Sequence, residues 1–245
     1  MRRRELAYRL YRVPWGALDL LFPPYCGGCG LAGSRWCPKC QSQLNLLSDP
    51  LCEICGVPLA AAGTCPACRA ERPSFRMLRS WSAFEGPIRD ALHRLKYRRD
   101  VGLGDALAAH LAGYVRTLAW PVDTVVPVPL GAGRLKERGY NQISLIARPL
   151  ALSLGWSYAP GALTRVRETK SQVGLTKSER HDNVRGAFRT FGMRVNGRVV
   201  LLMDDVATTG STLSSCADAL YRAGARDVFS LTVARALVHH GLKTA

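Results

Sequence analysis

Eight of the nine cysteines of this 245-residue chain stand in four C-x2-C pairs within its first third. Two residues between cysteines allow a tight turn that directs both sulfurs to one point, and two such turns supply the four thiolates of a tetrahedral zinc site. Four turns therefore predict two zinc ions. The ligands would be Cys26, Cys29, Cys37, Cys40, Cys52, Cys55, Cys65 and Cys68.

The spacing allows the four pairs to be grouped in two ways. We favour the sequential grouping, in which residues 26–40 hold one ion and residues 52–68 the other, although an interleaved grouping satisfies the same spacing. The segment has so few large apolar residues that it needs metal to fold, which makes both zincs structural. Two filled sites would lower the formal charge from +16 to about +12. The chain stays strongly basic, and this favours an anionic partner.

The N-terminus bears on where the protein works. Disulfide bonds, the other use of paired cysteines, need an oxidising compartment. The first residues are basic, but Arg9, Arg12 and Asp19 interrupt their apolar positions, so they contain no signal-peptide core. No run of about 18 apolar residues occurs, and we expect no transmembrane segment. We therefore expect a cytoplasmic protein.

Beyond the cysteines, helical patterns alternate with short apolar strands, which predicts an α/β fold with a parallel sheet flanked by helices. We divide the chain into an amphipathic, basic N-terminal segment (1–22), a double zinc ribbon (23–72) and an α/β domain (80–245), with a linker over 69–80. The expected helices cover about 86–100, 103–118, 142–154 and 211–225, and the expected strands cover 123–130, 199–203 and 227–234.

The segment VVLLMDDVATTGST, residues 199–212, carries the strongest functional signal. Its five apolar residues predict a strand buried on both faces in the middle of the sheet. Asp204, Asp205 and the loop 206–212 would then lie at the carboxyl end of that strand, where open parallel sheets bind ligands. The loop offers N–H groups and hydroxyls at a helix N-terminus, which favours a phosphate. The loop residues concerned are Thr208, Thr209, Gly210, Ser211 and Thr212.

Two classes of phosphate loop are excluded by what this segment lacks. It has no lysine after a second glycine, as a Walker loop requires, and no three spaced glycines, as a dinucleotide loop requires. The adjacent carboxylates suit a ligand that carries hydroxyls, because they can accept hydrogen bonds from a sugar diol. A phosphorylated ribose meets both requirements. The alternative, in which threonine and serine only cap the helix, leaves two acids at a central strand end without a role.

These residues resemble the phosphoribosyl pyrophosphate (PRPP) signature of the type I phosphoribosyltransferases. Together with the cysteine pairs, the stretches FEGPIRDALHRLKY and VPVPLGAGRLKERGYNQ resemble the ComF family of competence proteins, and the resemblance covers nearly the whole chain. It implies a type I phosphoribosyltransferase-like domain over residues 80–245. A third matching segment contains Gln172, Leu175, Arg180, Asn183, Ala187 and Phe188.

The resemblance also implies roles for individual residues. Asp204 and Asp205 would bind the ribose 2′- and 3′-hydroxyls, residues 208–212 would bind the 5′-phosphate, and Mg²⁺ would accompany PRPP. Pyrophosphate would lie near the VPVPL turn, against the backbone of Leu130 to Gly133. Candidate cationic contacts there are Arg134 and Arg138. A flexible loop over 164–176 would close over the ligand. Its candidate contacts are Arg165 and Lys170.

Two functions are compatible with this resemblance. In the first, the chain is a PRPP-binding protein of the ComF type that acts in DNA uptake and natural transformation and contacts single-stranded DNA. The zinc module would then offer a surface to DNA-uptake or recombination proteins. In the second, it is an active phosphoribosyltransferase that transfers phosphoribose to a base or amine with release of pyrophosphate, with Asp204, Asp205, Lys170 and Arg165 in catalytic positions. The sequence contains no recognisable pocket for an acceptor, so whether the chain is an enzyme stays open.

Overall fold

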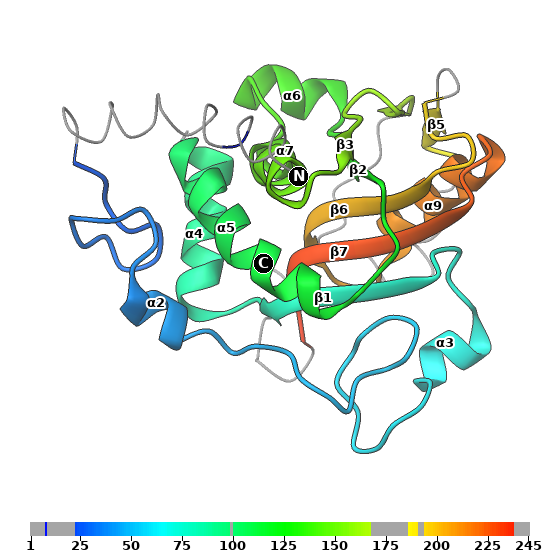
Figure 1. Cartoon of the computed structure of the whole chain (residues 1–245), viewed down its shortest axis with the longest axis horizontal. Coiled ribbons are helices and arrows are strands. Elements are labelled where there is room, and N and C mark those ends of the chain that lie inside the picture. The colour runs from blue at the N-terminus through cyan, green and yellow to red at the C-terminus, as the bar shows by residue number, and fades with distance from the viewer. Residues whose placement is uncertain (1–7, 9–22, 99, 168–185, 191–193, 238–245) are drawn as a thin grey trace.

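The computed structural model describes residues 8, 23–98, 100–167, 186–190 and 194–237 (Figure 1). Within these residues, five parallel strands form one sheet in the order β1-β7-β6-β2-β3. The strands are β1 (Met77–Ala83), β7 (Asp227–Arg235), β6 (Val199–Ala207), β2 (Thr124–Pro127) and β3 (Ser157–Tyr158). The parallel sheet flanked by helices confirms the expected fold class.

Strand β6 lies in the middle of the sheet, as its unbroken apolar run predicts. It pairs with β7 on one side and β2 on the other, and residues 199–203 are all buried. The strand is longer than expected, because its pairing with β7 continues from Asp204 to Ala207. The two aspartates therefore lie within the strand rather than after it, and only residues 208–210 separate the strand from the next helix.

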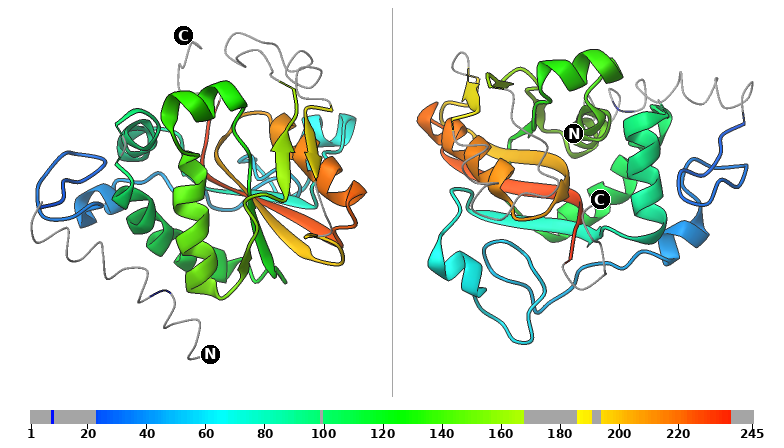
Figure 2. Two further views of the ribbon diagram at one scale, coloured as in Figure 1. Left: turned by 90° about the horizontal axis from the view of Figure 1, so that it is seen from above. Right: turned by 180° about the vertical axis from the view of Figure 1, so that it is seen from behind.

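Helices cover both faces of the sheet (Figure 2). The core on one face joins Leu201 and Met203 of β6 to the apolar sides of three helices: α4 (Gly86–Tyr97), α5 (Gly102–Thr117) and α7 (Gln142–Leu154). The core on the other face joins Val200 and Leu202 to α9 (Ser211–Arg222). This division follows from the alternation of side chains along a strand.

Individual residues explain how two of these helices begin and how a third packs. Pro87 stands in the first turn of α4, where its missing N–H is tolerated. Asn141 caps α7 by accepting a hydrogen bond from the Ile143 N–H. Helix α5 packs closely on α7, since a Cβ added at Gly104 would lie 2.7 Å from the Leu145 carbonyl oxygen.

The first zinc module, residues 23–44, packs against α4 and α5. It contains the short helix α2 (Pro38–Ser42). Cys26 and Cys40 belong to the same core as those helices. Gly27 and Gly28 permit the contact, because a Cβ added at Gly27 would lie 2.4 Å from Leu103 and one at Gly28 would lie 2.8 Å from Pro87.

The second zinc module, residues 50–70, packs against β1 at the edge of the sheet. It contains the short helix α3 (Pro66–Ala70). The Leu78 N–H of β1 donates to the Ile54 carbonyl at 2.7 Å, and the Arg235 guanidinium donates to the Cys55 carbonyl at 2.6 Å. The two modules therefore lie far apart, with α2 and α3 at opposite ends of the molecule (Figure 1).

Strand β1 corrects the expected linker. We predicted a linker over residues 69–80, but residues 77–80 already belong to the sheet. The polar residues Ser80 and Ser82 conceal the strand, because both are buried and make cross-strand hydrogen bonds to β7. The division into 1–22, 23–72 and 80–245 otherwise stays a prediction, and its N-terminal segment lies almost entirely outside the described residues.

Two further strands form a separate antiparallel pair, β4 (Leu163–Arg165) with β5 (Phe188–Thr190). They bring the two ends of the segment 166–187 together beside α9. In the part of the chain that the structure describes, no helix is long and apolar enough to cross a membrane.

Candidate functional site

The cysteines form two separate four-sulfur clusters, one in each zinc module. Within the clusters, Sγ atoms lie 3.6 Å apart for Cys26 and Cys40, and 3.8 Å apart for Cys55 and Cys65. Four sulfurs at about 2.3 Å from a tetrahedral zinc are about 3.8 Å from one another, so the spacing fits zinc. The sequential grouping is confirmed. Its members are Cys26, Cys29, Cys37 and Cys40 in one site and Cys52, Cys55, Cys65 and Cys68 in the other.

Backbone N–H groups prepare the first cysteine of each cluster to bind metal as a thiolate. Burial by itself would raise the pKa of Cys26 and Cys52, but N–H groups of the surrounding turns lower each pKa to about 6. The Cys37 N–H lies 3.4 Å from the Cys26 sulfur, and the Cys65 N–H lies 3.3 Å from the Cys52 sulfur. With four sulfurs in each cluster, the sites are suited to structural zinc.

The predicted ligand site lies at the carboxyl ends of the central strands. The Val128 N–H, just after β2, donates to the Met203 carbonyl of β6 at 2.8 Å. Asn141 fixes the same region from α7, because its side-chain amide donates to the Val128 carbonyl at 2.9 Å. The VPVPL turn thus lies beside Asp204 and Asp205, as expected for two halves of one site.

Asp205 is buried and has a cationic partner. The Lys96 ammonium of α4 lies 2.5 Å from Asp205 Oδ2, and the Gln142 amide of α7 donates to the same oxygen at 3.2 Å. Burial would raise the pKa of Asp205, but Lys96 and these hydrogen bonds hold it below its usual value. Arg138 extends the network by donating to the Gln142 amide oxygen at 2.9 Å.

Asp204 lies in a different environment although it is the adjacent residue. It is half-buried and projects from the opposite face of β6, on the side of Cys216 and α9. The Asp205 N–H donates to Asp204 Oδ1 at 2.8 Å. Burial and the neighbouring charge of Asp205 raise the pKa of Asp204 well above its usual value. Of the two acids, Asp204 is the one that forms no ion pair among the described residues.

The loop after β6 leads directly into α9. Gly210 adopts φ +83°, a left-handed conformation that suits glycine, and it stands at the N-cap of α9 without a side chain that could cap it. The Thr209 hydroxyl lies 2.8 Å from the Ser211 hydroxyl, and it accepts the Ser211 N–H at 3.3 Å. Thr208 is exposed, and Thr212 stands in the first helical turn. A phosphate at this N-terminus would be favoured by the helix dipole.

The predicted pyrophosphate loop is partly helical. Leu130 precedes the helix α6 (Ala132–Arg138), which includes Gly133, so only the start of the 130–133 stretch is a loop. Arg134 is exposed on α6. Arg138 lies over the Tyr97 ring, with its guanidinium carbon 5.1 Å from the ring centroid. The structure brings Arg138 into the network of Asp205, whereas it gives Arg134 no such contact among the described residues.

The predicted flexible loop is only partly described. Arg165 belongs to β4, where its guanidinium lies 5.6 Å from the centre of the Phe188 ring. Lys170 lies outside the described residues, as do Gln172, Leu175, Arg180 and Asn183 of the matching segment. The roles of Arg165 and Lys170 stay predictions.

Sequence reasoning missed Lys96 and Gln142 as members of the site. A signal for Lys96 exists, because it continues the i, i+4 row of Ile88 and Leu92 on the buried side of α4. A lysine in line with an apolar row points to a buried carboxylate elsewhere in the fold. Nothing in the local sequence identifies that carboxylate as Asp205.

The central strand β6 and the loop after it carry the motif VVLLMDDVATTGST, residues 199–212. A parallel sheet with this motif, joined to two four-cysteine sites, defines a phosphoribosyltransferase-like α/β protein with a double zinc ribbon. Residues 17–69 match the double zinc ribbon domain family. The chain is 36% identical over 220 residues to "DNA utilization protein YhgH" of Salmonella typhimurium, covering 85% of this chain and 96% of the relative. It is 31% identical over 220 residues to "Competence protein F" of Haemophilus influenzae, and the match covers 86% of this chain and 94% of that relative. The chain belongs to the ComF family of competence proteins.

Solved structures are similar at a weaker level. A glutamine PRPP amidotransferase from B. subtilis, complexed with ADP and GMP, matches 59% of this chain and 27% of its own chain at 22% identity and a TM-score of 0.36. A hypoxanthine phosphoribosyltransferase from Staphylococcus aureus matches 53% of this chain and 61% of its own chain, at 13% identity and a TM-score of 0.32. The family assignment rests on the sequence relatives.

Proposed function

We propose that this chain binds PRPP together with Mg²⁺ at the carboxyl ends of β2 and β6. The main support is that Asp204, which forms no ion pair among the described residues, lies close to the N-terminus of α9, where the N-cap residue Gly210 has no side chain to cap the helix. Ribose hydroxyls would donate to Asp204 and Asp205, and the 5′-phosphate would meet residues 208–212. Mg²⁺ would supply positive charge to the pyrophosphate and to the acids. Arg138 would reach the pyrophosphate from α6.

Calorimetric titration of the zinc-loaded chain with PRPP and Mg²⁺ tests this proposal. Wild-type protein should bind, and the double variant Asp204→Asn/Asp205→Asn should lose that binding because both hydroxyl acceptors are weakened. Asp218→Asn is the matched control, since it removes one exposed acid from α9. An affinity that stays unchanged in the double variant would show that the aspartates do not hold the ribose.

Transfer of the phosphoribose to an acceptor is the alternative function. One observation favours the transferase function. Because β4 pairs with β5, both ends of the segment 166–187 lie beside α9, where a closing loop would cover the site. Pyrophosphate release should then be measured with PRPP and a panel of nucleobases and amines. Release with one acceptor would establish a transferase, and silence on every acceptor would favour a binding protein.

We further propose that the chain acts in the cytoplasm, in DNA uptake and natural transformation, by contacting single-stranded DNA. Support comes from the relatives named for DNA utilization and competence and from the formal charge of +16. The zinc modules would present surfaces to DNA-uptake or recombination proteins. Affinity for an oligonucleotide should fall steeply with salt, and a flat response would contradict phosphate contacts.

A further inference from the structure

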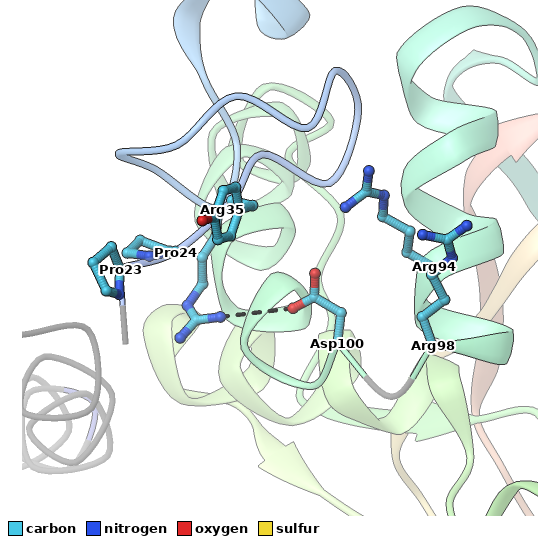
Figure 3. Close-up of a pocket in the computed structure, with 7 residues that line it drawn as sticks. Pro23, Pro24, Arg35, Arg94, Arg98 and Asp100 are labelled. Carbon is cyan, nitrogen blue, oxygen red and sulfur yellow. Dashed lines mark ion pairs between the residues drawn. The ribbon is translucent and has the colours of Figure 1, made fainter. Parts of the chain in front are cut away.

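The first zinc module and α4 enclose a groove that the ribose-phosphate site does not use. The groove has a volume of about 460 Å³ and is lined by two prolines and five other residues (Figure 3). Those five are Tyr25, Arg35, Arg94, Arg98 and Asp100. Arg94 lies in the last turn of α4, and Arg98 is the C-cap residue that follows the helix. Arg94 lies about 200° around the helix from Lys96. The groove and the Asp205 network therefore lie on opposite sides of α4.

The groove has an excess of positive charge. Arg35 Nη1 lies 3.6 Å from Asp100 Oδ1, so one of the three arginines is compensated. Within the described residues, neither Arg94 nor Arg98 forms an ion pair. Two guanidinium groups on adjacent turns present several donors in a fixed order, an arrangement suited to the oxygens of successive phosphates.

Two glycines make room for the side chains of Arg35 and Arg94. A Cβ added at Gly102 of α5 would lie 2.4 Å from the Arg35 guanidinium carbon, and one at Gly30 would lie 3.3 Å from Arg94 Nη2. Gly30 belongs to the first zinc turn and adopts φ +78°. The zinc module and α5 thus place the guanidinium groups of Arg94 and Arg35 close to bare backbone at the groove.

An aromatic ring completes the groove. Tyr25 is 60% exposed, although it directly precedes the buried ligand Cys26. Its backbone pairs with Ala32 across the zinc turn, so the metal site fixes its position. An exposed aromatic ring beside uncompensated arginines is the combination that binds unpaired bases and their phosphates. A duplex, whose bases are stacked inside, would leave the ring unused.

We propose that this groove binds single-stranded DNA, with Arg94 and Arg98 contacting consecutive phosphates and Tyr25 stacking on a base. The inference rests on the proposed role in DNA handling and names the surface responsible. It separates the two ligands of the protein, because PRPP would bind on one side of α4 and DNA on the other.

Fluorescence anisotropy with a labelled oligothymidylate tests the groove in the full zinc-loaded chain. Arg94→Gln/Arg98→Gln should weaken binding about tenfold or more, and should reduce the slope of log affinity against log salt by about 2. Arg222→Gln/Arg226→Gln removes the same charge at the C-terminal end of α9 and just after it. Helix α9 packs on the opposite face of the sheet from α4 (Figures 1 and 2), so this variant should retain nearly wild-type affinity. Equal affinities of the two double variants would overturn the proposal.

Further variants test the aromatic contact and the fold. Tyr25→Ala should lose about fivefold or more in affinity, whereas Tyr25→Phe should keep it. Equal loss in both would overturn the stacking role, and a duplex of the same length that competes as well as the single strand would overturn the preference. Two zincs per chain and unchanged PRPP affinity in Arg94→Gln/Arg98→Gln would show an intact fold. Absence of DNA binding in the wild type would refute the DNA role itself, whereas retained binding in this variant refutes only the groove.

Discussion

Asp204 and Asp205 are adjacent in the chain but differ in their electrostatic environment. Asp205 has Lys96 as a buried partner, so its negative charge is stabilised by the fold. Asp204 is half-buried beside a second carboxylate, and burial and that neighbouring charge both oppose its negative charge. A site that binds its ligand through Asp204 would thus sacrifice stability to keep a charge available.

Single substitutions should therefore change stability in opposite directions. At pH 7, Asp205→Asn should lower the free energy of unfolding by about 1–3 kcal/mol, because it removes the carboxylate that pairs with Lys96. Asp204→Asn should raise the free energy of unfolding, because it removes an opposed charge. Urea denaturation of the zinc-loaded protein measures both, with Asp218→Asn expected within about 0.5 kcal/mol of wild type. Stabilisation by Asp205→Asn would contradict the ion pair.

The same difference should depend on pH. An acid whose folded pKa is raised is most stabilising when protonated, so the advantage of Asp204→Asn should vanish as the pH falls towards about 4 and grow above it. An acid whose folded pKa is lowered contributes its stability above its unfolded value of about 4 and loses it as the pH falls through the folded value. Unfolding midpoints measured from about pH 2 to pH 8 should reveal both trends, with the Asp204 effect above pH 4 and the Asp205 effect below it. A pH-independent gain for Asp204→Asn would exclude titration as its cause.

The position of the aspartates could be predicted from sequence, but their difference could not. An apolar run followed by two acids and a Thr-Gly loop fixes the strand end by local pattern alone. The identity of the partner depends on α4, which lies more than 100 residues earlier and meets β6 only in the folded sheet. The only local signal of this long-range ion pair is that Lys96, a charged residue, continues the apolar row of α4.

At the scale of the elements, helices α5 and α7 can pack closely because Gly104 of α5 has no side chain at their contact. Gly104 lets the Leu145 backbone approach α5, whereas Gly113 on the same helix has open space around it. A helix interior usually favours alanine over glycine by about 1 kcal/mol, so the two glycines provide a matched comparison.

Alanine substitutions should separate close packing from helix propensity. Gly104→Ala should destabilise the protein by about 1–3 kcal/mol, because its Cβ would collide with backbone that cannot rotate away. Gly113→Ala, exposed and unhindered, should stabilise it by about 1 kcal/mol. Chemical denaturation measures both values. A gain in stability from Gly104→Ala would mean that the helices can separate at little cost.

The two zinc sites differ in exposure. All four ligands of the second site are buried, whereas Cys29 of the first site is exposed and Cys37 is half-buried. Thiolates that solvent reaches react faster with thiol reagents and chelators. The first site should therefore exchange its metal more readily than the second.

Zinc release should accordingly occur in two steps. A thiol-modifying reagent added with a coloured zinc indicator should liberate one zinc quickly and the second slowly. Cys29→Ser should weaken the first site, so that its zinc is already missing or is released even faster. Cys216→Ser, which alters a buried cysteine outside both clusters, should keep both release steps. A single step that releases two equivalents together would contradict independent sites.

At the scale of the whole molecule, the modules are arranged in a way that the cysteine spacing does not determine. The spacing predicts two adjacent ribbons, and each cluster forms as expected. Where each ribbon packs depends on surfaces of α4, α5 and β1, which are assembled only by the sheet. For that reason the groove beside Tyr25 could not be foreseen, because its walls come from segments that are separate in sequence.

The backbone bonds along β1 have a consequence for the molecule's solubility. The outer strand of a parallel sheet offers unpaired N–H and carbonyl groups to a strand of another chain. Here the Leu78 N–H bonds to the Ile54 carbonyl, and the Ala83 N–H bonds to the Asn45 carbonyl at 2.8 Å, so the second zinc module and the segment that joins the two modules cover this edge. Zinc starvation should therefore produce chains that aggregate through β1, and light scattering after chelation should rise before the helical circular dichroism signal falls. Zinc binding would then prevent β1 of one copy from pairing with β1 of another.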